Sequence, residues 1–205
     1  MNLLQADSKL LQIGVSCLTT REVAAYLNVT TVYASNILCR LVRERRVTRL
    51  GRGRWLIGNK VDPFAVPEYL TTPYQTYISL QSALYHHGMI SQIPAVVYAV
   101  SLARTKRYRN LIGEFSIHHV EPGFFFGYET LGRSTIKMAL PEKALVDYIY
   151  LSLGRSKLFG ALPELELPRT FSLERAHKFI DRIPNQSKRR AVLSRVNSLV
   201  DGSRK

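Results

Sequence analysis

The sequence is poor in cysteine, in acidic residues and in long apolar runs, and each shortage excludes a class of protein. Cys17 and Cys39 are its only cysteines, too few for a disulfide-stapled fold and typical of a reducing compartment. Both fall in segments with buried patterning, so we expect two core thiols. No apolar run approaches the roughly twenty residues that cross a bilayer, and the first residues lack a signal-peptide pattern. The sequence therefore predicts a cytoplasmic protein without membrane contact.

The shortage of acidic residues leaves a large positive charge. The sequence has 29 Lys and Arg but only 15 Asp and Glu, which gives a net charge of +14 over 205 residues. A surplus of this size favours a polyanionic partner such as nucleic acid. Residues 1–60 hold ten basic and three acidic side chains, and eight of the ten lie between Arg40 and Lys60. The N-terminal part is therefore the predicted nucleic-acid-binding part.

Motifs of catalysis and of metal binding are also missing. The sequence contains no Gly-rich phosphate loop, no Gly-x-Ser-x-Gly elbow and no paired carboxylates at metal-ligand spacing. Two histidine doublets occur, but neighbouring residues on a strand face opposite sides, and no cysteine accompanies either doublet at ligand spacing. We expect a protein that is not an enzyme and that holds neither a cofactor nor a metal.

Residues 19–44 have the pattern of two helices joined by a short turn. Thr19-Thr20-Arg21-Glu22 predicts a capping box at the start of a first helix. Asn28 tolerates the left-handed conformation that the turn needs. A second, more basic helix is predicted from Thr31 to Glu44, with its apolar residues at core-facing spacing. This arrangement is typical of a helix-turn-helix.

A basic hairpin is predicted directly after the second helix. Short strands are expected at Val47–Leu50 and Trp55–Ile57, separated by Gly51-Arg52-Gly53-Arg54. Glycine permits the positive φ of a tight hairpin, whose tip then carries two arginines. A basic hairpin in this place is typical of a wing, so the sequence predicts a winged helix-turn-helix.

The predicted DNA contacts follow from the outward face of the second helix and from the wing. The residues that we expect to contact base edges in the major groove are Thr30, Thr31, Tyr33, Ser35, Asn36 and Arg40. Asn36 could pair with adenine and Arg40 with guanine. The residues that we expect to contact DNA phosphates are Arg43, Arg45, Arg46, Arg49, Arg52 and Arg54. The wing arginines could instead enter a narrow minor groove, and a solvated basic face is the alternative to DNA binding.

The rest of the chain predicts a second domain. We assign residues 1–61 to the winged helix-turn-helix, 62–74 to a linker with extended X-Pro pairs, and 75–205 to a C-terminal domain. Helices are expected at Tyr77–His87, Glu142–Leu153, Ser172–Arg182 and Asn185–Val200, and strands at Val96–Val100, Phe115–Val120, Phe124–Tyr128 and Thr135–Met138. The predicted class is α+β, with a C-terminal mixed α/β domain that has a small, mostly antiparallel sheet and flanking helices.

Charged residues of the second domain are weaker candidates for a partner site. Lys143 and Asp147 form an i, i+4 pair, and Glu142 precedes them in the first turn of a helix. A surface bridge with a dipole-favoured Glu142 is one interpretation, and a contact to a partner is the other. Arg104, Lys106 and Arg107 form a basic stretch between predicted strands, which is either solvated surface or a second contact region.

Three stretches resemble the AbiEi-type antitoxins of type IV toxin–antitoxin systems. The first runs from Leu18-Thr19-Thr20-Arg21-Glu22-Val23-Ala24 through the Arg/Gly hairpin. The second is Tyr77-Ile78-Ser79-Leu80-Gln81-Ser82-Ala83-Leu84-Tyr85-His86-His87-Gly88. The third, and most specific, is Lys137-Met138-Ala139-Leu140-Pro141-Glu142-Lys143-Ala144-Leu145-Val146-Asp147. Together they span most of residues 17–153, whereas 162–205 carries no motif.

The resemblance implies a function in two parts. The winged helix would repress its own operon by binding inverted repeats in the promoter, and the second domain would counteract a nucleotidyltransferase-like toxin. Two alternatives stay open from the residues alone. The second domain could bind a small molecule that regulates DNA binding, or the protein could act mainly through its interaction with a toxin, with DNA binding incidental.

Overall fold

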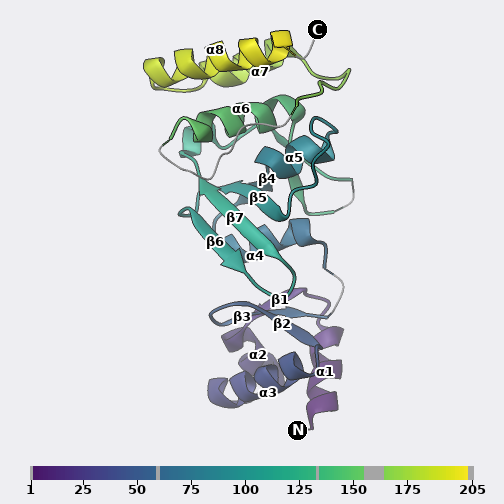
Figure 1. Cartoon of the computed structure of the whole chain (residues 1–205). Coiled ribbons are helices and arrows are strands. Elements are labelled where there is room, and N and C mark those ends of the chain that lie inside the picture. The colour runs from purple at the N-terminus through teal and green to yellow at the C-terminus, as the bar shows by residue number, and fades with distance from the viewer. Residues whose placement is uncertain (1, 59–60, 133, 155–163, 203–205) are drawn as a thin grey trace. The chain divides into compact units, whose positions relative to one another are not determined.

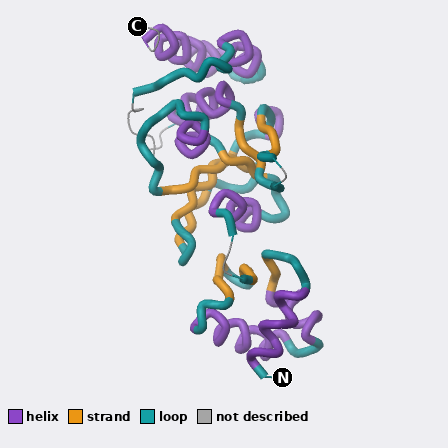
Figure 2. The backbone as a smooth tube through the Cα atoms, turned by 90° about the vertical axis from the view of Figure 1, so that its right-hand side faces the viewer, coloured by secondary structure: helices purple, strands orange, loops and turns teal. Residues whose placement is uncertain are grey.

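The structure is a computed structural model that describes residues 2–58, 61–132, 134–154 and 164–202 (Figures 1 and 2). The chain divides into two compact units. Unit 1 comprises Met1–Leu70 and Arg109–Gly113, and unit 2 comprises Thr71–Tyr108 and Glu114–Lys205. Both units contain helices and strands, so the predicted α+β class is confirmed. None of the described helices has the length and apolarity to cross a membrane.

Unit 1 packs three helices and a small sheet around one core. The helices are α1 (Leu3–Gln12), α2 (Thr20–Leu27) and α3 (Thr31–Arg43). The strands β1 (Cys17–Thr19), β2 (Val47–Gly51) and β3 (Arg54–Ile57) form an antiparallel sheet in the order β1-β3-β2. Buried residues from all six elements share one apolar cluster. The sequence did not predict α1 or β1, although Asn2 and Gln5 form a capping box before α1.

The predicted linker contains helical structure. Residues 62–74 were expected to be extended, but the structure has a 3-10 helix η1 (Pro63–Ala65) followed by α4 (Val66–Thr71). Asp62 caps this segment, because its carboxylate accepts the Phe64 N–H at 2.8 Å. Proline in a first helical turn lacks only an N–H that would be unpaired there. Asp62-Pro63 and Val66-Pro67 thus begin helices here, and the two units divide after Leu70.

Unit 2 is built on a six-stranded mixed sheet. Its strands are β4 (Thr76–Ile78), β5 (Val96–Ser101), β6 (Lys106–Arg109), β7 (Glu114–His119), β8 (Tyr128–Thr130) and β9 (Lys137–Ala139), in the order β6-β7-β5-β4-β9-β8. Strands β4–β5 and β8–β9 pair antiparallel, but β4–β9 and β5–β7 pair parallel. The sheet of unit 2 is therefore mixed, which is a coarser result than the mostly antiparallel sheet that the sequence predicts. Strand direction depends on the crossover connections, which local residue alternation does not reveal.

The helices of unit 2 form two layers on the sheet. They are α5 (Leu80–His86), α6 (Pro141–Ser152), α7 (Leu173–Asp181) and α8 (Gln186–Gly202). Helix α6 contacts β9 and α5 on one side and α7 and α8 on the other, so it lies between the sheet and the C-terminal helix pair (Figure 1). Residues 141–149 of α6 are accordingly buried all round, as expected for a helix enclosed by other elements.

Two elements of unit 2 differ from their predicted type. Tyr77 and Ile78 were assigned to a helix but belong to β4, and α5 begins only after Ser79. The Phe124–Tyr128 segment was expected to be a strand, but Phe124 ends the 3-10 helix η2 (Pro122–Phe124) and β8 begins at Tyr128. In both cases the side chains are held by contacts with α6, described below, that no local pattern contains.

Candidate nucleic-acid interface

The turn between α2 and α3 is fixed by side-chain caps. Thr19 Oγ1 accepts the Glu22 N–H at 3.2 Å, and the Glu22 carboxylate accepts the Thr19 N–H at 2.6 Å, so the predicted capping box is confirmed. The hydrogen bond that the Thr19 backbone donates to this carboxylate favours its charged form and lowers the pKa of Glu22. Asn28 is left-handed with φ 52°, as predicted. The predicted base contact Thr30 is exposed, but its oxygen caps α3 by accepting the Tyr33 N–H at 3.2 Å.

Helix α3 has one buried face and one open face. Ala34, Ile37, Leu38 and Leu41 are buried, as predicted. We call the opposite side, with spacings of four, three and four residues, the outward stripe; its members are all exposed and are Val32, Asn36, Cys39 and Arg43. The sequence prediction included Asn36 and Arg43 but missed Val32 and Cys39, because an apolar residue type was taken as a sign of burial.

The other predicted base contacts lie on the flanks of α3. Thr31, Tyr33 and Arg40 are exposed beside the outward stripe, so they remain accessible to a ligand. Ser35 was expected to point outward but is half-buried, because it lies one helical turn before the buried Leu38. The structure therefore gathers Asn36 and Arg40 on the accessible side of the helix, as the DNA-binding interpretation requires.

The β2–β3 hairpin is present and is held against α2. Gly53 has φ +69°, so it supplies the conformation that the turn needs. Its carbonyl accepts the Thr20 N–H at 3.0 Å. The indole of Trp55 donates to Thr20 Oγ1 at 2.8 Å. These contacts fix the hairpin and leave Arg52 exposed at its tip.

The arginines around the hairpin differ in how accessible they are to an anionic ligand. Arg54 was predicted to contact phosphate, but it is half-buried and its guanidinium donates to the carbonyls of Tyr69 and Leu70 at 2.7 and 2.9 Å. The guanidinium of Arg49 lies 5.6 Å from the Trp55 ring centroid, a cation–π arrangement, and Arg49 is exposed. Arg54 therefore has a structural role, and Arg49 and Arg52 are the accessible cations of the hairpin.

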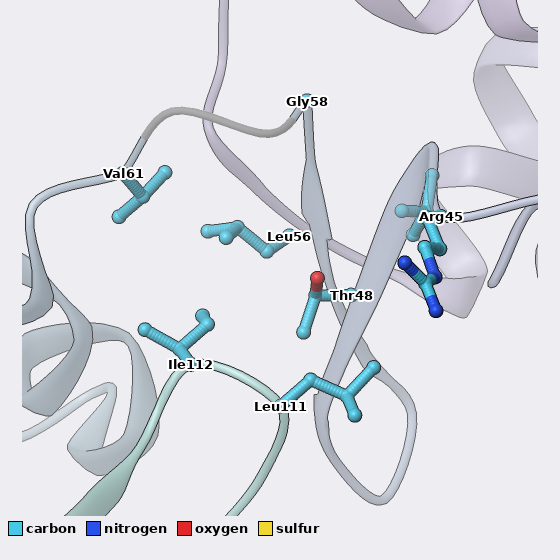
Figure 3. A pocket seen from close by; sticks show the side chains of 8 residues that line it. Arg45, Thr48, Leu56, Gly58, Val61, Leu111 and Ile112 are labelled. Atoms are coloured by element: carbon cyan, nitrogen blue, oxygen red, sulfur yellow. The ribbon is translucent and has the colours of Figure 1, made fainter.

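The residues that follow α3 carry further positive charge. Arg45 and Arg46 are exposed. Arg46 lies 3.7 Å from the buried carboxylate of Asp7 on α1, so part of its charge is balanced within unit 1. Arg45 borders an open hollow of about 550 Å³ (Figure 3). Its other lining residues are Val47, Thr48, Leu56, Gly58, Val61, Leu111 and Ile112.

The two thiols of unit 1 lie in different environments. Both were predicted to be buried, but Cys39 is exposed on the outward stripe, which corrects that prediction. Cys17 is half-buried on β1, and desolvation raises its pKa from 9.0 to about 11. The thiol of Cys17 therefore stays protonated at neutral pH, whereas Cys39 is open to solvent.

Three of the predicted partner residues of unit 2 are not on its surface. Glu142, Lys143 and Asp147 have an exposed side-chain fraction of 0%. The predicted i, i+4 pair of Lys143 and Asp147 is present, but the burial of these side chains rules out both a surface bridge and a surface contact with a partner in this fold. Periodicity placed them on the first turns of α6 correctly, but it could not reveal that α7 and α8 cover this helix.

Lys143 and Asp147 instead form a buried network. The ammonium of Lys143 donates to the Asp147 carboxylate and, at 3.0 Å, to the Tyr77 hydroxyl. The same carboxylate accepts Tyr77 Oη at 2.9 Å and Ser79 Oγ at 2.8 Å. Burial lowers the pKa of Lys143 and raises that of Asp147, while the attraction between the two charges opposes both changes. The network joins α6 to β4.

Aromatic rings enclose the ammonium of Lys143. It lies 4.0 Å from the ring centroid of Phe124 and 4.9 Å from that of Phe126, which favours a desolvated cation. Gly127 completes the enclosure, because a Cβ at this position would lie 3.0 Å from the lysine side chain. The segment 124–127 is therefore shaped by Lys143 and does not form the predicted strand.

Glu142 attaches α7 to α6. Its carboxylate accepts the Ser172 N–H at 2.7 Å and lies 3.4 Å from the Arg175 guanidinium. The start of α7 is thus held by a buried acceptor on α6. Both carboxylate oxygens of Glu142 therefore have partners within unit 2: Oε1 accepts the Ser172 N–H, and Oε2 accepts from the Arg175 guanidinium.

The basic stretch of unit 2 remains accessible. Arg104, Lys106 and Arg107 are exposed, and the last two lie on β6, the edge strand of the sheet. The Lys106 ammonium lies 4.8 Å from the ring centroid of Tyr108 on the same strand. Positive charge on an edge strand protects it from pairing with another sheet, and it also provides a surface for an anionic partner.

Comparison with known proteins adds no relative. No protein-family model matches the chain, and no curated protein matches it either. Among the described residues, no group of three or more His, Cys, Asp and Glu side chains could hold a metal ion. The functional argument therefore depends on the residues and geometry of the two units.

Proposed function

We propose that unit 1 is a winged helix-turn-helix domain that binds double-stranded DNA. In this proposal α3 enters the major groove and the β2–β3 hairpin is the wing. The observation that carries the proposal is the outward stripe of α3, which stays exposed beside exposed arginines. These cations lie at the end of α3, directly after it and on the hairpin: Arg40, Arg43, Arg45, Arg46, Arg49 and Arg52.

The two groups of residues would do different work. Asn36 lies in the part of α3 that meets base edges, and its amide has the donor and acceptor geometry for adenine. Arg43 and the cations that follow it would neutralise phosphates, and this contact supplies affinity without sequence preference. A protein with both groups on one accessible side would bind many duplexes weakly and its own site tightly.

The main experiment measures DNA affinity as a function of salt. The intact chain is titrated into a labelled duplex from its own upstream region, and the dissociation constant is followed between about 50 and 200 mM salt. If the five arginines from Arg43 onward contact phosphate, affinity falls about 500-fold over this range. Removing one contact with Arg43→Gln or Arg52→Gln lowers the salt slope by about one.

A matched control separates specific contacts from net charge. Arg190→Gln removes the same charge from an exposed position on α8 of unit 2, and it should leave the salt slope as it is. A flat salt response of the wild-type protein would contradict DNA binding. An equal loss in all three variants would show that the overall charge, and not unit 1, attracts the duplex.

We further propose, on the resemblance described above, that the protein represses a toxin–antitoxin operon and that unit 2 is the antitoxin part. Two of the stretches that carry the resemblance are in contact within unit 2. Strand β4 pairs with β9 at Ile78 and Met138, and the Tyr77 hydroxyl donates to Asp147 at 2.9 Å. These stretches pack against each other inside unit 2, so an exposed region of the unit must make any contact with the toxin.

Co-expression tests the antitoxin proposal. A nucleotidyltransferase-like protein encoded beside this gene should arrest growth, and this chain, expressed from an unrelated inducible promoter, should restore it. Arg43→Gln should keep this protection while losing repression of the native promoter. The charge reversals Lys106→Glu and Arg107→Glu test the exposed edge of unit 2 as the contact region. Protection that disappears with Arg43→Gln would contradict separate functions for the two units.

A further inference from the structure

An apolar side chain stands in the region of α3 that faces the proposed ligand. Val32 is the second residue of α3, and 71% of its surface is exposed. It belongs to the outward stripe and precedes Asn36 by one helical turn. No core contact explains a branched apolar residue at this position, which is opposite the buried face of Ala34 and Leu38.

The chemistry of the major groove limits what Val32 can recognise. Valine has no hydrogen-bonding group in its side chain, so it can read neither the donors and acceptors of base edges nor a phosphate. The one apolar group that a base presents in the major groove is the C5-methyl of thymine. Contact between the two would remove apolar surface of both partners from water.

The spacing along α3 relates this contact to Asn36. One helical turn advances about 5.4 Å, and successive base pairs are about 3.4 Å apart along the duplex. Val32 and Asn36 therefore face bases separated by one or two base-pair steps. Both side chains are exposed on the outward stripe.

We infer that Val32 packs against the C5-methyl group of a thymine and selects thymine at that position of the recognition site. The selected thymine lies one or two base pairs from the base read by Asn36. This inference rests on the proposed function of unit 1 and adds a specificity-determining residue to it. It also gives the exposed valine a reason to be apolar, which phosphate contact does not.

A protein partner on Val32 is the competing explanation. Tyr26 on α2 and Tyr33 on α3 are also partly exposed, at 48% and 43%, and aromatic residues are frequent in protein interfaces. However, the outward stripe that contains Val32 also carries the polar Asn36 and the charged Arg43, whereas the centre of a protein interface is depleted in charge. The observations therefore favour a nucleic-acid ligand for this stripe.

The inference is tested by removing the C5-methyl group from thymine and, separately, the two methyl groups from Val32. The preferred duplex is first selected from a randomised pool with the wild-type protein. Each thymine in it is then replaced singly by deoxyuridine, which lacks only the C5-methyl, and dissociation constants are measured at fixed salt. One replacement should weaken wild-type binding about fourfold, the equivalent of burying one methyl group. With Val32→Ala the same replacement should change affinity by less than about 1.5-fold.

Val15→Ala is the matched control, because Val15 is also an exposed valine but lies outside α3. It should keep the wild-type response to deoxyuridine. A preferred site without thymine, no sensitive thymine, or unchanged sensitivity in Val32→Ala would overturn the inference while DNA binding stands. Loss of all duplex binding in the wild-type protein would instead overturn the proposed function. Val32→Ala leaving every duplex affinity unchanged would also overturn the inference.

Discussion

Lowering the pH should destabilise unit 2 through His118, a buried imidazole on β7. Its Nε2 lies 3.0 Å from Ser116 Oγ, its ring stacks with Tyr98, and the nearby Arg107 adds positive charge. Desolvation, assisted by Arg107, lowers the pKa of His118 from 6.5 to about 4. The neutral ring is thus favoured in the folded state, and protonation is favoured in the unfolded chain.

The sign and size of the effect follow from this pKa difference. A lowered folded-state pKa contributes stability that is present above pH 6.5 and is lost as the pH falls toward about 4. At about 1.4 kcal/mol per pKa unit, the whole window corresponds to about 3 kcal/mol. Between about pH 7 and pH 5, unit 2 should lose about 2 kcal/mol of unfolding free energy through this residue.

Urea unfolding at the two pH values measures this loss. The chain has a single tryptophan, Trp55 in unit 1, so tryptophan fluorescence reports unit 1. The near-ultraviolet circular dichroism of tyrosine mainly follows unit 2, which holds eight of the 11 tyrosines. His118→Gln removes the titration but keeps a polar group beside Ser116, so its pH-dependent loss should be about 2 kcal/mol smaller than that of the wild type.

Equal losses in the wild type and in His118→Gln would refute the reasoning. If the variant does not fold, a proton NMR titration of the wild-type imidazole decides the matter directly. A pKa near 6.5 for His118 in the folded protein would show that burial does not disfavour its charged form.

Three further predictions concern packing and capping. Asp147→Ala should cost about 3–5 kcal/mol in urea unfolding, because it leaves a buried ammonium unpaired, whereas the double variant Lys143→Met/Asp147→Leu should recover most of this loss. Additive losses would contradict the pairing. Gly127→Ala should lower the melting temperature of unit 2 by an amount equivalent to about 1–3 kcal/mol, since φ is +75° and Lys143 occupies the space; no change would exclude this crowding. Thr19→Ala should cost unit 1 about 1 kcal/mol by fluorescence-detected unfolding, and Thr19→Ser should restore it.

Unit 1 was the more predictable half, because its signals are local. A capping box, a left-handed Asn28 and a glycine hairpin each lie within a few residues of the structure they specify. Helix α1 was missed although Asn2 and Gln5 carry the same kind of cap. The burial of Arg54 was also missed, since its acceptors are backbone carbonyls 15 and 16 residues away.

Unit 2 was less predictable, because distant residues define its core. Nothing within a few residues of Lys143 shows that Tyr77 donates to its partner carboxylate from 70 positions away. Considered without their distant partners, the charged residues Glu142, Lys143 and Asp147 have a spacing typical of an exposed helix face. The strand assignment for Phe124 and Phe126 failed for the same reason, since their rings are placed by a lysine on another element.

The position of Cys39 makes the proposed interface accessible to chemistry without any mutation. Because the Cys17 thiol has a pKa of about 11, a maleimide reagent at neutral pH should modify Cys39 first. A fluorophore attached there would sit midway along the helix proposed to enter the groove, and bound duplex would protect the thiol from the reagent. The protein thus carries its own attachment point for footprinting, and the same thiol makes α3 sensitive to electrophiles.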